Sequence, residues 1–105
     1  MRIIIVDNVV GRRSRHKKIM RKFVDHTFFL EEECTIDHFL KNKYDIYVVH
    51  KNNQVEYKYV YNEKLGDHRI FFSGGQTKIH DTDDCLFADI ETMYARLNEL
   101  LSNVP

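Results

Sequence analysis

Tyr44-Asp45-Ile46-Tyr47-Val48-Val49-His50 is an apolar run that ends in a single titratable side chain. The pattern predicts a strand of a parallel sheet. In an open α/β sheet, the loops at the carboxyl ends of the strands form the ligand crevice, so His50 is a candidate site residue. Two other apolar runs end in the same way, residues 3–6 at Asp7 and residues 70–72 at Ser73.

The segments before this run alternate between strand and helix patterns. Residues 2–6 are too continuously apolar for a strand with one wet face and too few for a helix, which predicts a buried parallel strand. After Gly11, Ser14 is expected to cap a helix, with the cations on its outer face. Residues 27–30 form a second strand, and Thr35 begins a second helix. The expected apolar faces are His16, Ile19, Met20, Phe23 and Val24 in the first helix, and Ile36, Phe39 and Leu40 in the second.

Residues 54–66 allow two interpretations. They begin with strand-like alternation after a polar segment that could serve as a hairpin loop. A helix is preferred because Tyr57, Tyr61 and Leu65 recur at four-residue spacing, and Gly66 follows as a helix-ending residue.

The last third of the chain continues the alternation. Residues 68–72 form a strand, Ser73-Gly74-Gly75 favours a tight turn, and residues 77–79 are expected to form a short fifth strand. The resulting order, β-α-β-α-β-α-β-β-α, predicts a mainly parallel sheet of four or five strands with helices on both faces. A final helix is expected to be capped by Asp81, Thr82 or Asp83 and to carry the apolar stripe Leu86, Ile90, Met93, Leu97, Leu100 and Leu101.

Length, charge and cysteine usage restrict the class of protein. The 105 residues predict one domain, residues 1–105. Sixteen basic and sixteen acidic side chains cancel, which argues against a global field for nucleic acid or membranes. Cys34 and Cys85 fit no metal-ligand spacing, and without an apolar leader the chain is expected to be cytoplasmic with reduced thiols. No run approaches the roughly 20 apolar residues that a membrane-spanning helix needs.

In the order of its elements, the chain resembles the receiver domains of bacterial response regulators, which have a flavodoxin-like fold. The resemblance covers nearly the whole chain and implies the strand order 2-1-3-4-5. Asp7 and Asn8 match the magnesium-binding acidic pair of that family, with one acid missing. Asp45 and His50 match the spacing of the third strand, with histidine in place of the phospho-accepting aspartate, and Ser73-Gly74 matches the end of the fourth strand. The lysine expected after the fifth strand has no clear match.

The resemblance implies a degenerate receiver, a non-catalytic signalling or interaction module that binds a protein partner or a second copy of itself. No catalytic residue is expected, and the candidate crevice is Asp7, His50 and Ser73. No cofactor is expected, and Asp7 is at most a weak magnesium ligand because a single hard ligand is present. Crevice ligands would contact Asn8, Lys51, Asn52, Gly74 and Gly75, and the partner surface implied on the last helix is Asp89, Thr92, Met93 and Arg96.

Two alternatives stay open. Asp7, His50 and Ser73 could serve a small phosphotransfer or phosphoester-hydrolysing enzyme, although no second carboxylate or cation clamp is evident. The basic first helix could also bind nucleic acid, since each neutralised phosphate adds a salt-dependent gain in affinity. The cations concerned are Arg12, Arg13, Arg15, Lys17 and Lys18.

Overall fold

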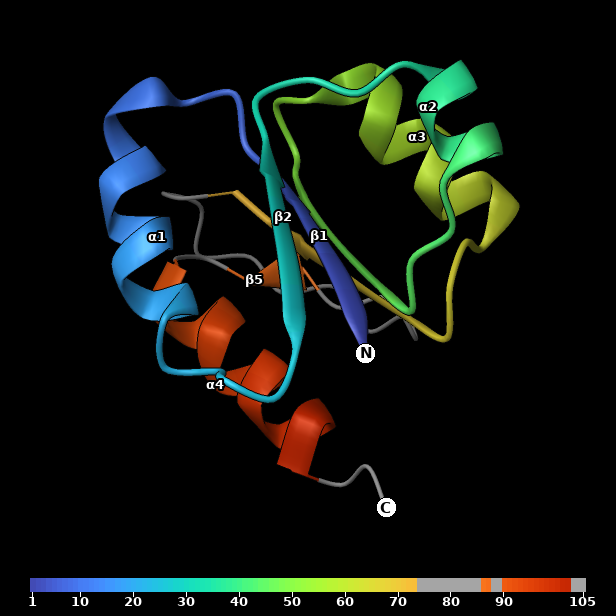
Figure 1. Cartoon of the computed structure of the whole chain (residues 1–105). Helices are drawn as coiled ribbons and strands as arrows, with labels where there is room; N and C mark the ends of the chain where they lie inside the picture. Colours follow the sequence, from blue (N-terminus) through green and yellow to red (C-terminus); the bar gives the residue numbers. More distant parts are fainter. Residues whose placement is uncertain (74–85, 88–89, 103–105) are drawn as a thin grey trace.

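A computed structural model describes residues 1–73, 86–87 and 90–102. It contains a sheet of five parallel strands in the order β2-β1-β3-β4-β5 (Figure 1). The predicted flavodoxin-like α/β fold and the order 2-1-3-4 of its first four strands are therefore confirmed. The strands are β1 (Arg2–Val6), β2 (Thr27–Glu31), β3 (Ile46–His50), β4 (His68–Phe72) and β5 (Leu86–Phe87), and the helices are the 3-10 turn η1 (Val10–Arg12), α1 (Arg13–Met20), α2 (Ile36–Lys41), α3 (Gln54–Glu63) and α4 (Ile90–Ser102).

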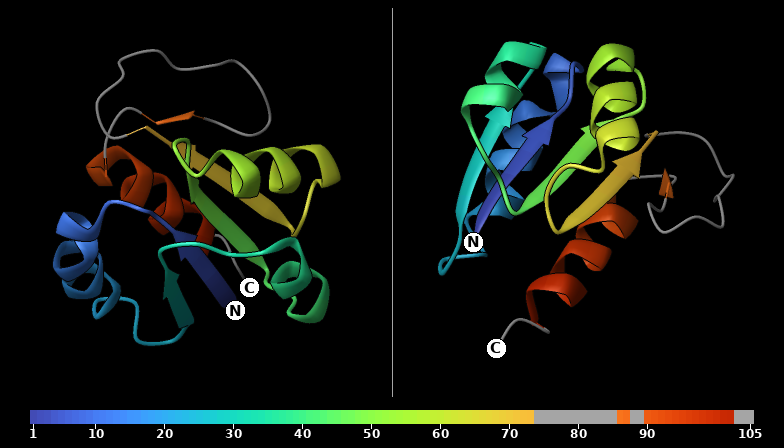
Figure 2. Two further views of the ribbon diagram at one scale, coloured as in Figure 1. Left: turned by 90° about the horizontal axis from the view of Figure 1, so that it is seen from above. Right: turned by 90° about the vertical axis from the view of Figure 1, so that its right-hand side faces the viewer.

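Helices cover both faces of the sheet, which gives three layers (Figure 2). Successive residues of a strand point to opposite faces, so Ile3 and Ile5 pack toward α1 and α4, whereas Ile4 and Val6 pack toward α2 and α3. Strands β1 and β3 are buried on both faces, which explains why their sequences are continuously apolar rather than alternating. No helix in the described part of the chain has the length and apolarity needed to span a membrane.

Residues 54–66 form a helix followed by a turn, as preferred from the spacing of their aromatic residues. Helix α3 ends at Glu63, and the residue that caps it, Lys64, has a left-handed backbone conformation. Gly66 also has a positive φ of 73°, and a Cβ there would lie 2.7 Å from the ring of Tyr47 and 2.8 Å from the carbonyl oxygen of Asp45. Only glycine fits this turn, which brings the chain down to start β4 against β3.

Several details of the predicted helices are wrong. Helix α1 begins at Arg13 with no side-chain cap, because η1 leads directly into it, so Ser14 is not its cap. The helix ends before Val24, which is 83% exposed. Helix α2 begins at Ile36, one residue later than predicted, and Thr35 caps it by accepting a hydrogen bond from the N–H of His38. Of the predicted apolar face of α2, Ile36 and Leu40 are exposed and only Phe39 enters the core.

The end of the chain also differs from the prediction. Leu86 belongs to strand β5 and not to the last helix, which begins at Ile90. The apolar stripe from Ile90 to Leu101 is otherwise confirmed, since its members are buried against the sheet. The strand expected at residues 77–79 and the caps expected at residues 81–83 lie outside the described residues.

Candidate functional site

The three predicted crevice residues lie at the carboxyl ends of neighbouring strands. Asp7 follows β1, His50 ends β3 and Ser73 follows β4, and the register pairs Val6 with Val49 and His50 with Phe72. In the strand order 2-1-3-4-5, the connection after β1 leads to β2 on one side of the sheet, and the connection after β3 leads to β4 on the other side. A crevice is therefore expected between these two connections, outside the carboxyl ends of β1 and β3. The structure therefore brings Asp7, His50 and Ser73 to one edge of the sheet.

The guanidinium group of Arg12 fills the space between Asp7 and His50. Its Nε lies 3.0 Å from Oδ2 of Asp7, and its Nη2 lies 3.4 Å from Oδ1 of Asp7 and 2.8 Å from Nε2 of His50. The ring of Phe72 lies beneath it, with the guanidinium carbon 5.9 Å from the ring centroid. The turn η1 holds Arg12 over the end of β1. A fixed protein cation thus occupies the centre of the crevice.

Asp7 is also bonded on its other side, by a chain of buried side chains. Its Oδ2 lies 2.8 Å from Nε2 of His16, and Nδ1 of His16 lies 2.6 Å from the hydroxyl of Tyr94 on α4. All three residues are buried. Because the Asp7 carboxylate only accepts hydrogen bonds, His16 donates to it through Nε2, and the Nδ1 of the same ring is hydrogen-bonded to the Tyr94 hydroxyl. The crevice is therefore connected to the last helix through α1.

These contacts determine the ionisation of Asp7. Burial acts to raise the pKa of the Asp7 carboxyl, but the hydrogen bonds from His16 and the N–H of Val9, together with the charge of Arg12, outweigh burial and lower that pKa. Burial raises the pKa of the Tyr94 hydroxyl, and the neighbouring Asp7 charge raises it further. The network therefore contains a carboxylate and a neutral phenol.

His50 is held as a neutral imidazole. Its side chain is buried, with Nε2 facing the Arg12 guanidinium and Nδ1 lying 3.2 Å from the N–H of Asn52. Both neighbours are hydrogen-bond donors, so a neutral ring can accept from one of them, whereas a protonated ring can accept from neither. Burial is the main reason that the pKa of His50 is lowered, and the Arg12 charge lowers it as well, against the opposing effects of Asp7 and a backbone hydrogen bond with Ser73.

We expect the free energy of unfolding to fall as the pH is lowered below about 6.5. The ordinary pKa of a histidine side chain is 6.5 and that of His50 is lower in the folded chain, so the unfolded chain binds the extra proton between these two values. Above pH 6.5, His50 makes its full contribution to the free energy of unfolding. This contribution is lost as the pH falls toward the pKa of His50 in the folded chain, with a slope of at most about 1.4 kcal/mol per pH unit. Urea unfolding across this range measures the slope. His50→Gln should flatten it, and an unchanged slope in that variant would assign the effect to other groups.

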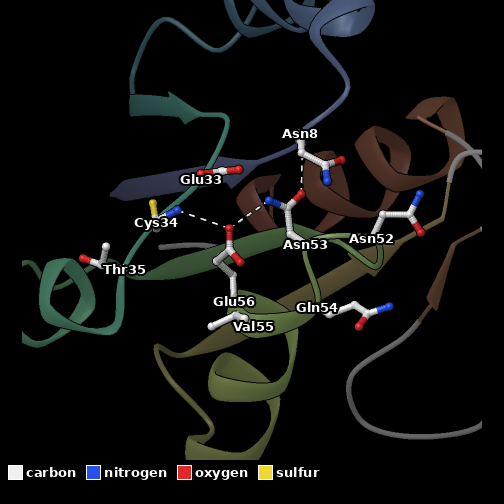
Figure 3. Close-up of a pocket in the computed structure, with 9 residues that line it drawn as sticks. All are labelled: Asn8, Glu33, Cys34, Thr35, Asn52, Asn53, Gln54, Val55 and Glu56. Carbon is white, nitrogen blue, oxygen red and sulfur yellow. Dashed lines mark hydrogen bonds between the residues drawn. The ribbon is translucent and has the colours of Figure 1, made fainter.

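A separate cavity of about 620 Å³ opens beside the crevice, between the loops that follow β1, β2 and β3 (Figure 3). It lies on the side of α2 and α3. Its polar framework is built around the buried side chains of Asn53 and Glu56. The nine lining residues are Asn8, Glu33, Cys34, Thr35, Asn52, Asn53, Gln54, Val55 and Glu56.

Asn53 and Glu56 join the three loops that form this cavity. Oδ1 of Asn53 accepts the N–H of Asn8 at 2.9 Å, and its Nδ2 donates to the carbonyl of Glu32 and to Oε2 of Glu56, both at 2.8 Å. Oε2 of Glu56 also accepts the N–H of Cys34 at 3.2 Å. Burial, reinforced by nearby acidic groups, raises the pKa of the Cys34 thiol to about 12, so it is not a thiolate nucleophile.

The structure places the other predicted ligand-contact residues in different positions. Asn8 and Asn52 line the cavity, whereas Lys51 is not among its lining residues and donates its backbone N–H to the carbonyl of Phe72. Gly74, Gly75 and Asp89 lie outside the described residues. Within the described part of the chain, no group of three or more His, Cys, Asp or Glu side chains could hold a metal ion.

The basic first helix is partly neutralised by acids. Arg12 is turned inward to Asp7, Arg13 lies 3.7 Å from Glu32, and Arg15 pairs with Glu91 on α4. Lys17 and Lys18 are exposed and form no ion pair with any described residue. The positive surface is therefore smaller than the sequence of this segment indicates, which weakens the nucleic-acid alternative.

Sequence reasoning missed four important residues of this region. His16 and Tyr94 extend the Asp7 network, and Asn53 and Glu56 build the cavity. One signal was present, because His16 is a polar residue on the apolar face of the first helix, where a buried hydrogen-bond partner is required. Glu56 in the first turn of α3 gave no comparable signal, since acids are common there.

Comparison of the chain with models of protein families, with curated proteins and with solved structures finds no match. Its fold class is shared by proteins of many unrelated activities. Function is therefore inferred from the chemistry of the crevice and of the cavity.

Proposed function

We propose that this chain is a non-catalytic signalling module that binds another protein, built like a response regulator receiver from which aspartyl phosphorylation has been lost. The observation that carries the proposal is the Arg12 guanidinium between Asp7 and His50, at 3.0 Å and 2.8 Å. It occupies the place where a phosphotransfer site would need a metal ion and an incoming phosphoryl group. The crevice is filled by the protein itself.

The groups around Arg12 also lack the properties that phosphoryl transfer requires. At the position that resembles the phospho-acceptor, His50 is buried, and each ring nitrogen faces a hydrogen-bond donor. Both oxygens of Asp7 are engaged by Arg12, His16 and the N–H of Val9, which leaves little room for the hard oxygen ligands that magnesium needs. Ser73 alone does not supply a nucleophile and a base.

The last helix is the surface that we propose for the partner, because the Asp7-His16-Tyr94 chain links it to the crevice. In receivers, the corresponding part of the fold serves output and dimerisation. The prediction for Met93 is wrong: it is fully buried against the sheet and cannot meet a partner. The outward-facing residues of α4 include Thr92 and Ala95, with the half-exposed Arg96 paired to Glu99 at 3.1 Å.

The absence of phosphotransfer is tested by incubating the protein with magnesium and acetyl phosphate and measuring its intact mass. We expect no phosphoryl adduct, because the acceptor position holds a buried neutral imidazole. A magnesium-dependent adduct that disappears in His50→Ala or Ser73→Ala would overturn the non-catalytic part of the proposal.

The interaction part is tested with matched surface variants. Ala95→Arg places a cation on the exposed face of α4, and Asn62→Arg places one on the exposed part of α3 across the sheet. Two measurements apply: sedimentation of the purified protein, which reports self-association, and capture of a partner protein from the native cell. Ala95→Arg should weaken the association that these measurements detect, and Asn62→Arg should not. A strict monomer that captures no partner, or equal impairment by both variants, would contradict the proposed surface.

A further inference from the structure

We propose that the cavity beside the crevice binds a small organic cation, a compound with an ammonium or guanidinium group. The inference is independent of the proposed function, because none of the Arg12, His16 or His50 side chains lines this cavity. Its volume of about 620 Å³ lies within the range of small-molecule sites, roughly 300–1,000 Å³. It also lies outside the carboxyl ends of β1 and β3, where ligands bind in sheets of this order (Figure 3).

The charge of the lining decides the class of ligand. Two of the nine lining residues are carboxylates, Glu33 and Glu56, and none is lysine, arginine or histidine. Anion sites in proteins use cationic side chains or unobstructed backbone N–H groups. The first turn of α3 does border the cavity, but Glu56 lies in that turn and offsets its positive dipole end. The cavity therefore favours a positively charged ligand.

Glu56 supplies a fixed and incompletely used acceptor. The residue is 6% exposed, and its two hydrogen bonds, from Asn53 and from the N–H of Cys34, both go to Oε2. Its Oε1 accepts no hydrogen bond from the described residues. A buried carboxylate held in place in this way forms stronger charge-assisted hydrogen bonds than an exposed one, and its orientation is set before a ligand arrives.

The remaining lining suits the body of an organic molecule better than a metal ion. Carboxamides surround the carboxylates, at Asn8, Asn52, Asn53 and Gln54, and Val55 adds an apolar side chain. These groups can bond the N–H donors of an amine or guanidine and cover its carbon chain. A metal ion would need several oxygen ligands within about 2.0–2.6 Å of one point, and the described residues offer no such group of acids.

The experiment is calorimetric titration of the full chain with agmatine, which carries both an ammonium and a guanidinium group. Butylurea serves as a neutral probe, inorganic phosphate as an anion and magnesium chloride as a metal ion. We expect saturable binding of agmatine only. Glu56→Gln and Glu33→Gln should each weaken it by about tenfold to a hundredfold, the range of one charge-assisted hydrogen bond.

Glu31→Gln is the matched control, because it removes the same charge from an exposed acid near the cavity that does not line it. It should leave agmatine binding within about twofold of the original, as expected for a screened surface charge. The proposal is overturned if agmatine does not bind, if butylurea, phosphate or magnesium binds as tightly, or if all three variants weaken binding equally. If Glu56→Gln fails to fold, the exposed Glu33→Gln decides the outcome alone.

Discussion

Arg12→Ala should lower the free energy of unfolding by about 3 kcal/mol, the low end of the cost of breaking a buried ion pair. The Asp7 side chain is 1% exposed and would lose its only guanidinium partner among the described residues. The loss should not be larger, because Asp7 keeps its hydrogen bonds from His16 and the N–H of Val9. Water entering the emptied space offsets part of the cost. Urea denaturation near neutral pH measures the change.

Arg13→Ala is the matched control for this variant. Arg13 is the next residue along the chain, but its ion pair with Glu32 spans 3.7 Å between half-exposed side chains. Pairs of this kind contribute about 0–1 kcal/mol. Equal destabilisation by the two variants would mean that Arg12 acts through the helix start and not through the crevice.

The same variant should raise the pKa of His50. Burial and the Arg12 charge both lower that pKa in the folded protein, and removing the arginine opens the ring to water while deleting the charge. An NMR titration of the His50 ring should therefore show a midpoint closer to the ordinary value in Arg12→Ala than in the original protein. A midpoint that stays the same would contradict the placement of Arg12 against this ring.

Much of the fold could be predicted because its central strands have a pattern that few other structures share. Ile3 to Val6 and Ile46 to Val49 are continuously apolar since both faces of these strands are covered, and the polar residue after each marks the strand end. Helix α3 could be recognised from its aromatic spacing. The end of the chain was less predictable, because Leu86 fits the helical period of the residues after it although it lies in a two-residue strand.

The site was predicted only as far as strand ends determine it. Asp7 and His50 could be placed because the carboxyl end of a parallel strand has a known position, whereas Arg12 lies on a turn whose direction no local pattern specifies. In the sequence, Arg12 belongs to a basic run with Arg13 and Arg15. Tertiary contacts turn Arg12 inward and leave its neighbours to pair with surface acids. The cavity likewise depends on contacts between residues distant in sequence, because Glu56 bonds the N–H of Cys34 and Asn53 bonds the carbonyl of Glu32.

His16→Ala should be the other strongly destabilising change, by about 4 kcal/mol. The residue is 1% exposed and bonds two buried groups, so its removal leaves a cavity and deprives the Tyr94 hydroxyl of its histidine partner, while Oδ2 of Asp7 keeps only the Arg12 Nε at 3.0 Å. Truncation of a large buried side chain costs about 2–5 kcal/mol, and each unsatisfied group adds about 1–3 kcal/mol, reduced where water can enter. Urea denaturation at neutral pH again gives the measurement.

Tyr94→Phe tests whether this cost comes from the hydrogen-bonded chain or from packing alone. In the original protein the substitution removes the hydroxyl that is hydrogen-bonded to Nδ1 of His16 at 2.6 Å, so it should cost about 1–2 kcal/mol. In the His16→Ala background the hydroxyl has already lost that partner, and removing it should be neutral or stabilising. The two effects should therefore differ by about 1–2 kcal/mol in a double-mutant cycle. If Tyr94→Phe has the same effect in both backgrounds, α4 is not coupled to Asp7 through His16, and the link between the crevice and the proposed partner surface fails with it.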